Sequence, residues 1–224
     1  MRACVAVLMM IAVTAFLGLA GALPARAASP GFCETYADHA ISEQSANQSL
    51  NCQLTGPRWN SDRMPHLTWC LLAQQQSGEN EAVWRLHDLG NCSLQGACDQ
   101  YAKNAIADNN AQNALGCRFD GPRWNSTFEG HASWCRAARW SSVDGEVVGR
   151  LRDMDLCRTC AEYAGKAVDA NRQNIAHNCG YTGPRWNSDP QGHIPWCLGA
   201  RMESRASEEG ARANDLAACY ARNR

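Results

Sequence analysis

Apolar residues recur at a helical spacing after Cys33. Tyr36, Ala37, Ala40 and Ile41 follow that cysteine at offsets of 3, 4, 7 and 8 residues. A stripe with this spacing covers one face of an α-helix, whereas a half-buried strand would alternate apolar and polar residues. The same offsets recur twice further along the chain, in Cys98, Tyr101, Ala102, Ala105 and Ile106 and in Cys160, Tyr163, Ala164, Ala167 and Val168. The pattern therefore predicts three helices of one kind.

The cysteines extend this periodicity into a repeat of whole segments. In each segment four cysteines are separated by 19, 18 and 22 residues, without insertion or deletion. We therefore divide the chain into repeat one (33–92), repeat two (98–157) and repeat three (160–219). The twelve positions are Cys33, Cys52, Cys70, Cys92, Cys98, Cys117, Cys135, Cys157, Cys160, Cys179, Cys197 and Cys219.

Two further helices are predicted in each repeat. A Gly-Pro pair first breaks the pattern, at Gly56-Pro57, Gly121-Pro122 and Gly183-Pro184. The second helix should begin near a histidine that recurs in every repeat, because Pro195 fits a first turn and not a helix interior. The third should follow Ser77, Ser142 or Ser204 and reach the fourth cysteine. We predict an all-α fold of three tandem disulfide-stapled three-helix units, each of about 60 residues with four cysteines.

The joins between repeats differ in length. The five-residue join Ser93–Ala97 permits a hinge between repeats one and two, whereas the two-residue join Arg158-Thr159 predicts close packing of repeats two and three.

A disulfide framework explains how units this small could be stable. Such a unit buries too little apolar surface to be secure alone, and each bridge would add ~2–4 kcal/mol. Four cysteines allow three pairings. We favour first-with-third and second-with-fourth, because a persistent helix would hold the first and second cysteines ~20 Å or more apart.

The N-terminus reads as a secretory signal peptide over residues 1–27. Arg2 precedes an apolar run from Ala3 to Leu23, and Ala25-Arg26-Ala27 resembles a cleavage site. An uncleaved membrane anchor is the competing interpretation, but Gly18, Gly21 and Pro24 break the end of the run. We expect cleavage after Ala27, no membrane insertion afterwards, and a periplasmic or secreted protein, where disulfides persist.

The charge of the mature chain argues against some partners. Loss of Arg2 and Arg26 lowers the number of basic residues from 21 to 19, against 22 acidic residues, which leaves a formal charge of −3. Such a balance does not provide the basic surface that nucleic acid or anionic lipid requires. We therefore expect neither as a partner.

Each repeat contains the same six-residue sequence, Gly-Pro-Arg-Trp-Asn-Ser, and a histidine seven residues after its tryptophan. Three residues beyond the histidine is a second tryptophan beside the third cysteine. The candidate ligand-binding residues are Arg58, Trp59, Asn60 and His66 in repeat one, Arg123, Trp124, Asn125 and His131 in repeat two, and Arg185, Trp186, Asn187 and His193 in repeat three.

These residue types suit a neutral, polyhydroxylated ligand. A sugar ring can stack on an indole, while arginine supplies a rigid set of donors and asparagine both donates and accepts. Three such loops in one chain would gain avidity for a polymer. The first hypothesis is therefore an exported, lectin-like binding protein, multivalent for carbohydrate or another extracellular or envelope polymer.

The alternative is a structural or protein-interaction module of the envelope, with the tryptophans as core. For Trp59, Trp124 and Trp186 the sequence leaves core and binding platform equally open. For the second tryptophans, Trp69, Trp134 and Trp196, it favours core. The histidines could cap the second helix.

The third helix repeats a Glu-x-x-x-Arg-x-x-Asp pattern, which we interpret as a solvated ladder of ion pairs. A sharper hypothesis is that its Arg or Glu reaches the loop and orients the histidine. The three patterns are Glu81, Arg85 and Asp88; Glu146, Arg150 and Asp153; and Glu208, Arg212 and Asp215.

An enzyme ranks third among the functions. His66 with Asp62 could act as acid and base in a small hydrolase, but Thr127 replaces that aspartate in repeat two and no nucleophile motif is present. We assign no catalytic residue, cofactor or metal, since one recurring histidine per repeat falls short of the three or four ligands of a zinc site.

Overall fold

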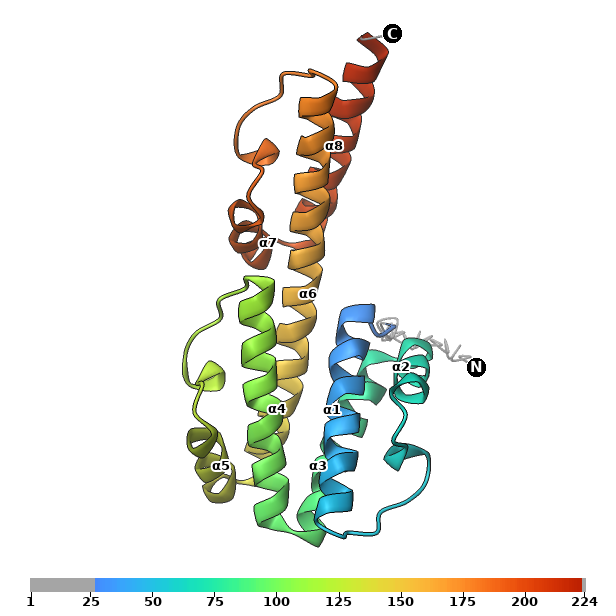
Figure 1. Ribbon diagram of the computed structural model, residues 1–224, viewed down its shortest axis with the longest axis vertical. Helices are drawn as coiled ribbons and strands as arrows, with labels where there is room; N and C mark the ends of the chain where they lie inside the picture. Colours follow the sequence, from blue (N-terminus) through green and yellow to red (C-terminus); the bar gives the residue numbers. More distant parts are fainter. Residues whose placement is uncertain (1–26, 223–224) are drawn as a thin grey trace, which may run out of the picture.

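The computed structural model describes residues 27–222, and the regular structure in this range is helical (Figure 1). The predicted all-α fold is confirmed. An isolated bridge between Ala27 and Gln74 is the one strand-like pairing among these residues. Apart from Ala27, the predicted signal peptide lies outside the described range.

Repeat one forms α1 (Pro30–Ser49), α2 (Arg63–Leu72) and α3 (Gln75–Cys92). Repeat two begins with α4 (Leu94–Leu115) and α5 (Phe128–Ala137). The first helices start three or four residues before the predicted cysteine, because Ser29 and Ser93 accept backbone N–H groups as N-caps. The third helices start two residues before the predicted serines.

Helix α6 (Trp140–Ala176) runs without interruption from repeat two into repeat three. It serves as the third helix of one repeat and the first of the next, so the Arg158-Thr159 join lies inside a helix of 37 residues. No proline or glycine interrupts that junction, and extending an existing helix is easier than starting a new one. The two repeats are therefore joined rigidly, end to end.

Repeat three is completed by α7 (Ile194–Gly199) and α8 (Met202–Arg222). Pro195 lies in the first turn of α7, as predicted. Short 3-10 helices occur at η1 (Pro57–Trp59), η2 (Pro122–Trp124), η3 (Pro184–Trp186) and η4 (Pro190–Gly192). The predicted repeat boundaries stay sequence-based divisions, since α6 crosses one of them.

The disulfides pair first with third and second with fourth cysteine in every repeat, which confirms the favoured pairing. One bridge joins the first helix to the second, and the other joins the loop to the end of the third helix. Cα–Cα separations of 5.4–5.7 Å suit disulfide geometry. The bridges are Cys33–Cys70, Cys52–Cys92, Cys98–Cys135, Cys117–Cys157, Cys160–Cys197 and Cys179–Cys219.

Repeats one and two lie face to face, with α1 and α4 antiparallel (Figure 1). The join that permits a hinge by its length is mostly helical: Ser93 alone separates α3 from α4. One buried cluster draws residues from both repeats, including Leu86, Leu89, Tyr101 and Val143. These two repeats therefore share a core.

Contacts across this interface are reciprocal. His39 of repeat one pairs with Asp108 of repeat two at 2.9 Å. Asn104 is the repeat-two equivalent of His39, and it donates at 3.2 Å to Glu43, the repeat-one equivalent of Asp108. Likewise Arg152 pairs with Glu79 at 2.7 Å, and the exchanged pair is His87 with Asp144 at 2.7 Å. The two repeats are thus related by an approximate internal two-fold axis.

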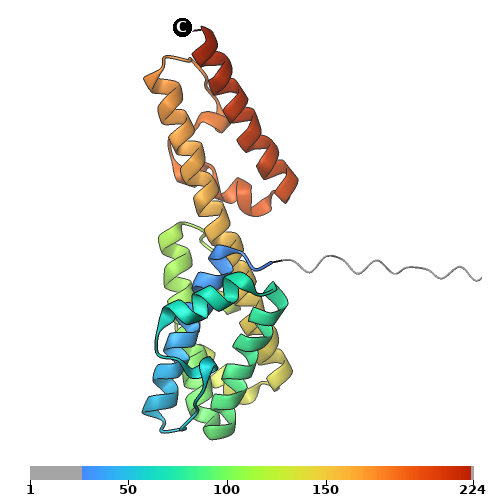
Figure 2. The same cartoon turned by 90° about the vertical axis from the view of Figure 1, so that its right-hand side faces the viewer.

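Repeat three extends beyond this six-helix body along α6 (Figures 1 and 2). Helix α8 packs against the second half of α6. No helix within residues 27–222 is both long and apolar enough to span a bilayer.

Candidate functional site

The Gly-Pro-Arg-Trp-Asn-Ser loops have the same conformation in all three repeats. Gly56, Gly121 and Gly183 have φ of 99°, 91° and 97° with ψ near 180°, a region essentially restricted to glycine. The following proline begins a single 3-10 turn. This turn directs the arginine and the tryptophan of the loop toward the third helix.

The loop tryptophans are buried. Trp59, Trp124 and Trp186 expose only 6, 8 and 7 % of their surface. The guanidinium of Arg85 lies 4.5 Å from the ring of Trp59, and that of Arg150 lies 5.2 Å from Trp124. Of the two interpretations that the sequence left open, the structure places these side chains in the core.

The loop arginines are held by two carboxylates of the third helix. Arg58 donates to both oxygens of Glu81, at 2.6 and 3.1 Å, and to Asp88 at 2.8 Å. Arg123 makes the same contacts with Glu146 and Asp153, and Arg185 with Glu208 and Asp215. Such two-pronged pairs fix a planar guanidinium in position.

The third-helix pattern is therefore not a solvated ladder, and that interpretation was wrong. Arg85, Arg150 and Arg212 expose 0, 2 and 3 % of their surface and lie in the interior. The sharper hypothesis was right that this helix reaches the loop, but its acidic residues bind the loop arginine instead of the histidine. The Arg123 guanidinium lowers the pKa of the Glu146 carboxyl, and Arg185 does the same to Glu208.

The asparagine and the histidine of each repeat also contact one another. The Asn60 side chain accepts the Asp62 N–H at 2.9 Å, and the Asn60 carbonyl lies 3.0 Å from Nε2 of His66. A carbonyl only accepts, so Nε2 carries the proton. His131 and His193 make the same bond to Asn125 and Asn187. The histidines thus close the loop and do not cap a helix with their side chains.

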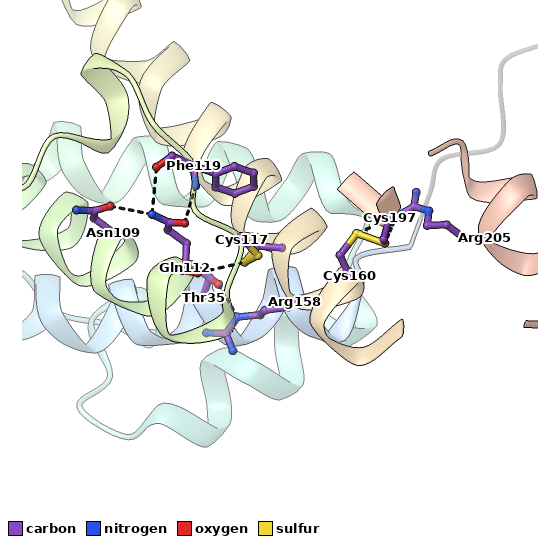
Figure 3. Close-up of a disulfide and its surroundings, with 10 residues drawn as sticks. Thr35, Asn109, Gln112, Cys117, Phe119, Arg158, Cys160, Cys197 and Arg205 are labelled. Atoms are coloured by element: carbon purple, nitrogen blue, oxygen red, sulfur yellow. Dashed lines mark hydrogen bonds between the residues drawn. A yellow bond between two sulfur atoms is a disulfide. The ribbon is translucent and has the colours of Figure 1, made fainter. Parts of the chain in front are cut away.

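A side-chain amide holds the entry of each loop, a feature that the sequence analysis missed. Gln112 accepts the Phe119 N–H at 2.8 Å and donates to the Phe119 carbonyl at 3.3 Å (Figure 3). Asn47 and Asn174 bind Leu54 and Tyr181 in the same way. The signal was an amide at one repeat position, five residues before the second cysteine.

The second tryptophans are half-exposed, contrary to their predicted place in the core. Trp69, Trp134 and Trp196 expose 42, 38 and 42 % of their surface. On the short helix, the cysteine that follows each tryptophan takes the buried position. The tryptophan itself therefore turns toward solvent. Each ring still packs on the first-helix tyrosine, with centroids 5.6, 5.6 and 5.4 Å from Tyr36, Tyr101 and Tyr163.

The exposed tryptophan lines a pocket that occurs in both repeat two and repeat three. Its walls are the first-helix tyrosine, the loop proline and arginine, the histidine and the third-helix glutamate. The pocket of repeat two has a volume of 230 Å³ and that of repeat three 380 Å³. In repeat one, Tyr36, His66 and Trp69 keep the same ring contacts.

The chemistry of this pocket combines an aromatic platform with a polar wall. Two aromatic rings offer apolar faces, while the Arg–Glu pair and the histidine provide hydrogen-bonding groups. Burial lowers the pKa of His131, so this imidazole is neutral at pH 7 and its Nδ1 is the unprotonated nitrogen. Of the predicted site residues both pockets include the arginine and the histidine. The pocket of repeat two adds Asn125 and that of repeat three adds Trp186, whereas Trp124 does not line its pocket.

Within residues 27–222 no three His, Cys, Asp or Glu side chains are grouped so that they could hold a metal ion. Comparison of the chain with protein-family models, with curated proteins and with solved structures found no match.

Proposed function

We propose that this is an exported, non-enzymatic binding protein that takes sugar rings of a glycan or another envelope polymer into its repeated pocket. The observation that supports this proposal most is that the second tryptophan of each repeat is half-exposed, namely Trp69, Trp134 and Trp196. A large aromatic surface left open at the same place three times is not needed by the core, which the buried loop tryptophan already fills.

The geometry favours a flat, neutral, hydroxyl-bearing ligand. An indole and a phenol ring meet at an angle and form an apolar corner, which one face of a sugar ring could cover. Arg123 and Glu146 also line the pocket, and the pairing of Arg123 with Glu146 and Asp153 leaves no free positive charge there, so this wall presents donors and acceptors to hydroxyl groups. The binding residues in this proposal are the second tryptophan, the tyrosine, the histidine and the Arg–Glu pair.

Rigid linkage suits binding to a polymer. Glu146 in the pocket of repeat two and Tyr163 in that of repeat three lie on the same helix, α6. Seventeen residues separate them, which corresponds to about 26 Å at 1.5 Å per residue. Two weak sites at a fixed separation bind a repetitive chain with avidity. Six disulfides support export, either to a periplasm or out of the cell, because they persist in oxidising compartments.

A titration of the oxidised protein with soluble polysaccharides tests this proposal. Tryptophan fluorescence should shift with at least one polymer. Trp134→Ala and Trp196→Ala should each weaken binding, and the double variant should weaken it more. Ile175→Ala serves as the control, because Ile175 is an exposed apolar residue of α6 that lies outside the pockets. If no polymer shifts the fluorescence, or if the Trp variants bind like the unmodified protein, the proposal fails.

A second candidate is a structural or protein-interaction module. The observation in its favour is that the arginine, tryptophan and asparagine of the six-residue loop have internal contacts, so folding alone accounts for that sequence. This candidate predicts that Trp134→Ala and Trp196→Ala leave partner binding intact, since variable surfaces would then bind the partner.

A further inference from the structure

The face by which repeats one and two cover each other is uncovered in repeat three. Lys166 occupies the repeat position of His39 and Asn104, and Ala170 that of Glu43 and Asp108. In repeats one and two these positions are buried and paired across the interface. In repeat three the Lys166 side chain is 56 % exposed and pairs with Glu162 of its own helix at 2.9 Å, not with a residue of another repeat.

The uncovered face is a groove between α6 and α8. It has a volume of 410 Å³, and its walls include Lys166, Ala170, Glu209 and Arg212. Arg212 exposes only 3 % of its surface, yet its Nη2 has no hydrogen-bond partner within residues 27–222. Ala213, which corresponds to the interface residue Leu86, is an exposed residue of the groove wall, and Ala206, which corresponds to Glu79, is exposed nearby on α8.

We propose that a second copy of this chain covers this face, with repeat three packing on repeat three about a two-fold axis. The pairing of repeats one and two is the precedent, because it shows that two units of this template associate face to face through reciprocal contacts. Two identical faces can repeat that arrangement only around a true two-fold axis.

The charges on the face fit a second copy. Val147, which occupies the position of Glu209, lines one small cavity together with His39 and Glu43 of the opposite repeat. His39 in turn occupies the position of Lys166. In the dimer Glu209 of one copy therefore lies close to Lys166 of the other, and this pair occurs twice. Ala170 leaves room for the longer lysine side chain.

Repeat three also has the space for a partner. It projects beyond the six-helix body: the first turns of α8, from Met202 to Glu209, share a cavity with Gln74 and Glu79 of repeat one, and the rest of α8 extends away from that body (Figures 1 and 2). The alternative occupant is water: the end unit of a repeat protein commonly has a polar outer face. A solvated end unit predicts a monomer, and it is one outcome of the test below.

Sedimentation equilibrium of the oxidised protein over a wide range of concentrations distinguishes the two. The unmodified protein should dimerise. Ala213→Arg, which places a bulky charge on an exposed position of the face, should abolish the dimer. Ala218→Arg is the matched control, because Ala218 is equally on the surface of α8 but outside the groove, and it should leave the dimer unchanged.

Charge exchange makes the test specific for the proposed contact. Lys166→Glu and Glu209→Lys should each raise the dimer dissociation constant by about tenfold or more, because each places like charges opposite one another. Because Glu209 also lies near Lys166 within one copy, the specific test is to mix the two single variants. K166E and E209K should form a heterodimer, since each contact between copies then pairs opposite charges while the charges within each copy stay alike. A monomer at every concentration would show that the face is a solvated end, and a dimer that ignores Ala213→Arg would place the interface elsewhere; either result overturns the proposal.

Discussion

Repeats one and two bury between them a polar network that repeat three replaces with exposed side chains. Glu43 accepts from Arg85 at 2.7 Å and from Asn104 at 3.2 Å, while His39 pairs with Asp108 nearby. Repeat three retains the arginine, as Arg212, but has Ala170 in place of the carboxylate. The same arrangement of cysteines, loop and helices therefore occurs with a buried polar face in repeats one and two and with an exposed face in repeat three. The residues at that face make the difference.

This comparison also separates what belongs to the unit from what belongs to the pairing. The disulfides, the loop with its arginine pair and the Tyr–Trp contact recur in all three repeats. The buried His39–Asp108 pair crosses the interface of repeats one and two, and the Arg85–Glu43 pair lies within repeat one beside it. Four tests, with seven substitutions in all, examine this division.

The largest difference is expected for the third-helix arginine. Arg85→Met leaves the Glu43 carboxylate buried without its main partner, which should lower the free energy of unfolding by about 3–5 kcal/mol. Arg212→Met loses a stacked ring and a bond to the Tyr163 hydroxyl, and should cost about 1–2 kcal/mol. Denaturant unfolding with the disulfides intact measures both, and equal losses would contradict the comparison.

A pH effect confined to the paired repeats comes next. Burial opposes the charged form of His39, but the charge and the hydrogen bond of Asp108 outweigh it and raise the pKa of His39 above 6.5. The folded protein then holds this proton more tightly than the unfolded chain. The stabilisation is complete below pH 6.5 and is lost as the pH rises through the raised pKa.

Burial raises the pKa of Glu43 above 4.5, so the net shift at Glu43 has the same sign as that at His39 and its stabilisation is also lost as the pH rises. Unfolding measured from pH 6 to pH 9 should therefore show falling stability in the unmodified chain. His39→Gln should flatten this slope, whereas Lys166→Gln in repeat three should not. A slope that persists in His39→Gln would assign the effect to other groups.

A smaller loss of stability, equal in repeats two and three, is expected when the loop arginine is replaced. Arg123→Gln and Arg185→Gln should each cost about 1 kcal/mol, because these arginines are about one-third exposed and solvent weakens their pairs. Their partners Glu146 and Glu208 have lowered pKa values, so they stabilise the fold above pH 4.5 and less as the pH falls. The variants should lose less stability in acid, which urea titrations at pH 3 and pH 6 would detect.

The smallest effect is expected at the edge of the interface. His87 and Asp144 form one of the reciprocal pairs, but their side chains are 38 and 31 % exposed. Asp144→Ala should cost about 0.2–1 kcal/mol and less at high salt. A loss as large as that of Arg85→Met would mean that the rim of this face, and not its buried centre, provides the stability.

Much of the architecture could be predicted from local patterns in the chain. The apolar stripe after Cys33, Cys98 and Cys160 predicted the first helices, and the Pro195 rule placed the start of α7. Equal cysteine spacing, together with the length of a helix, predicted the pairing of first with third and second with fourth. These inferences rest on periodicity and on chain geometry, which act over a few turns.

The candidate site was predicted less completely. The sequence left Trp124 open between core and binding platform and favoured the core for Trp134, yet Trp124 is buried while Trp134 is half-exposed. Neighbours along the chain do not determine this, because burial depends on which side of a short helix meets the tyrosine and the loop. The carboxylates of Glu146 and Asp153 were recognised as one face of a helix, but their partner Arg123 lies more than twenty residues earlier.

The sequence by itself determined the helices, the threefold repetition and the disulfide framework, because each depends on spacings within one unit. Only the tertiary structure decided that repeats one and two share a core, that α6 joins repeats two and three, and which tryptophan faces solvent. Those outcomes depend on contacts between residues that are distant along the chain. Repeat three shows the reason most clearly, because its sequence follows the same template while no other repeat within residues 27–222 buries its outer face.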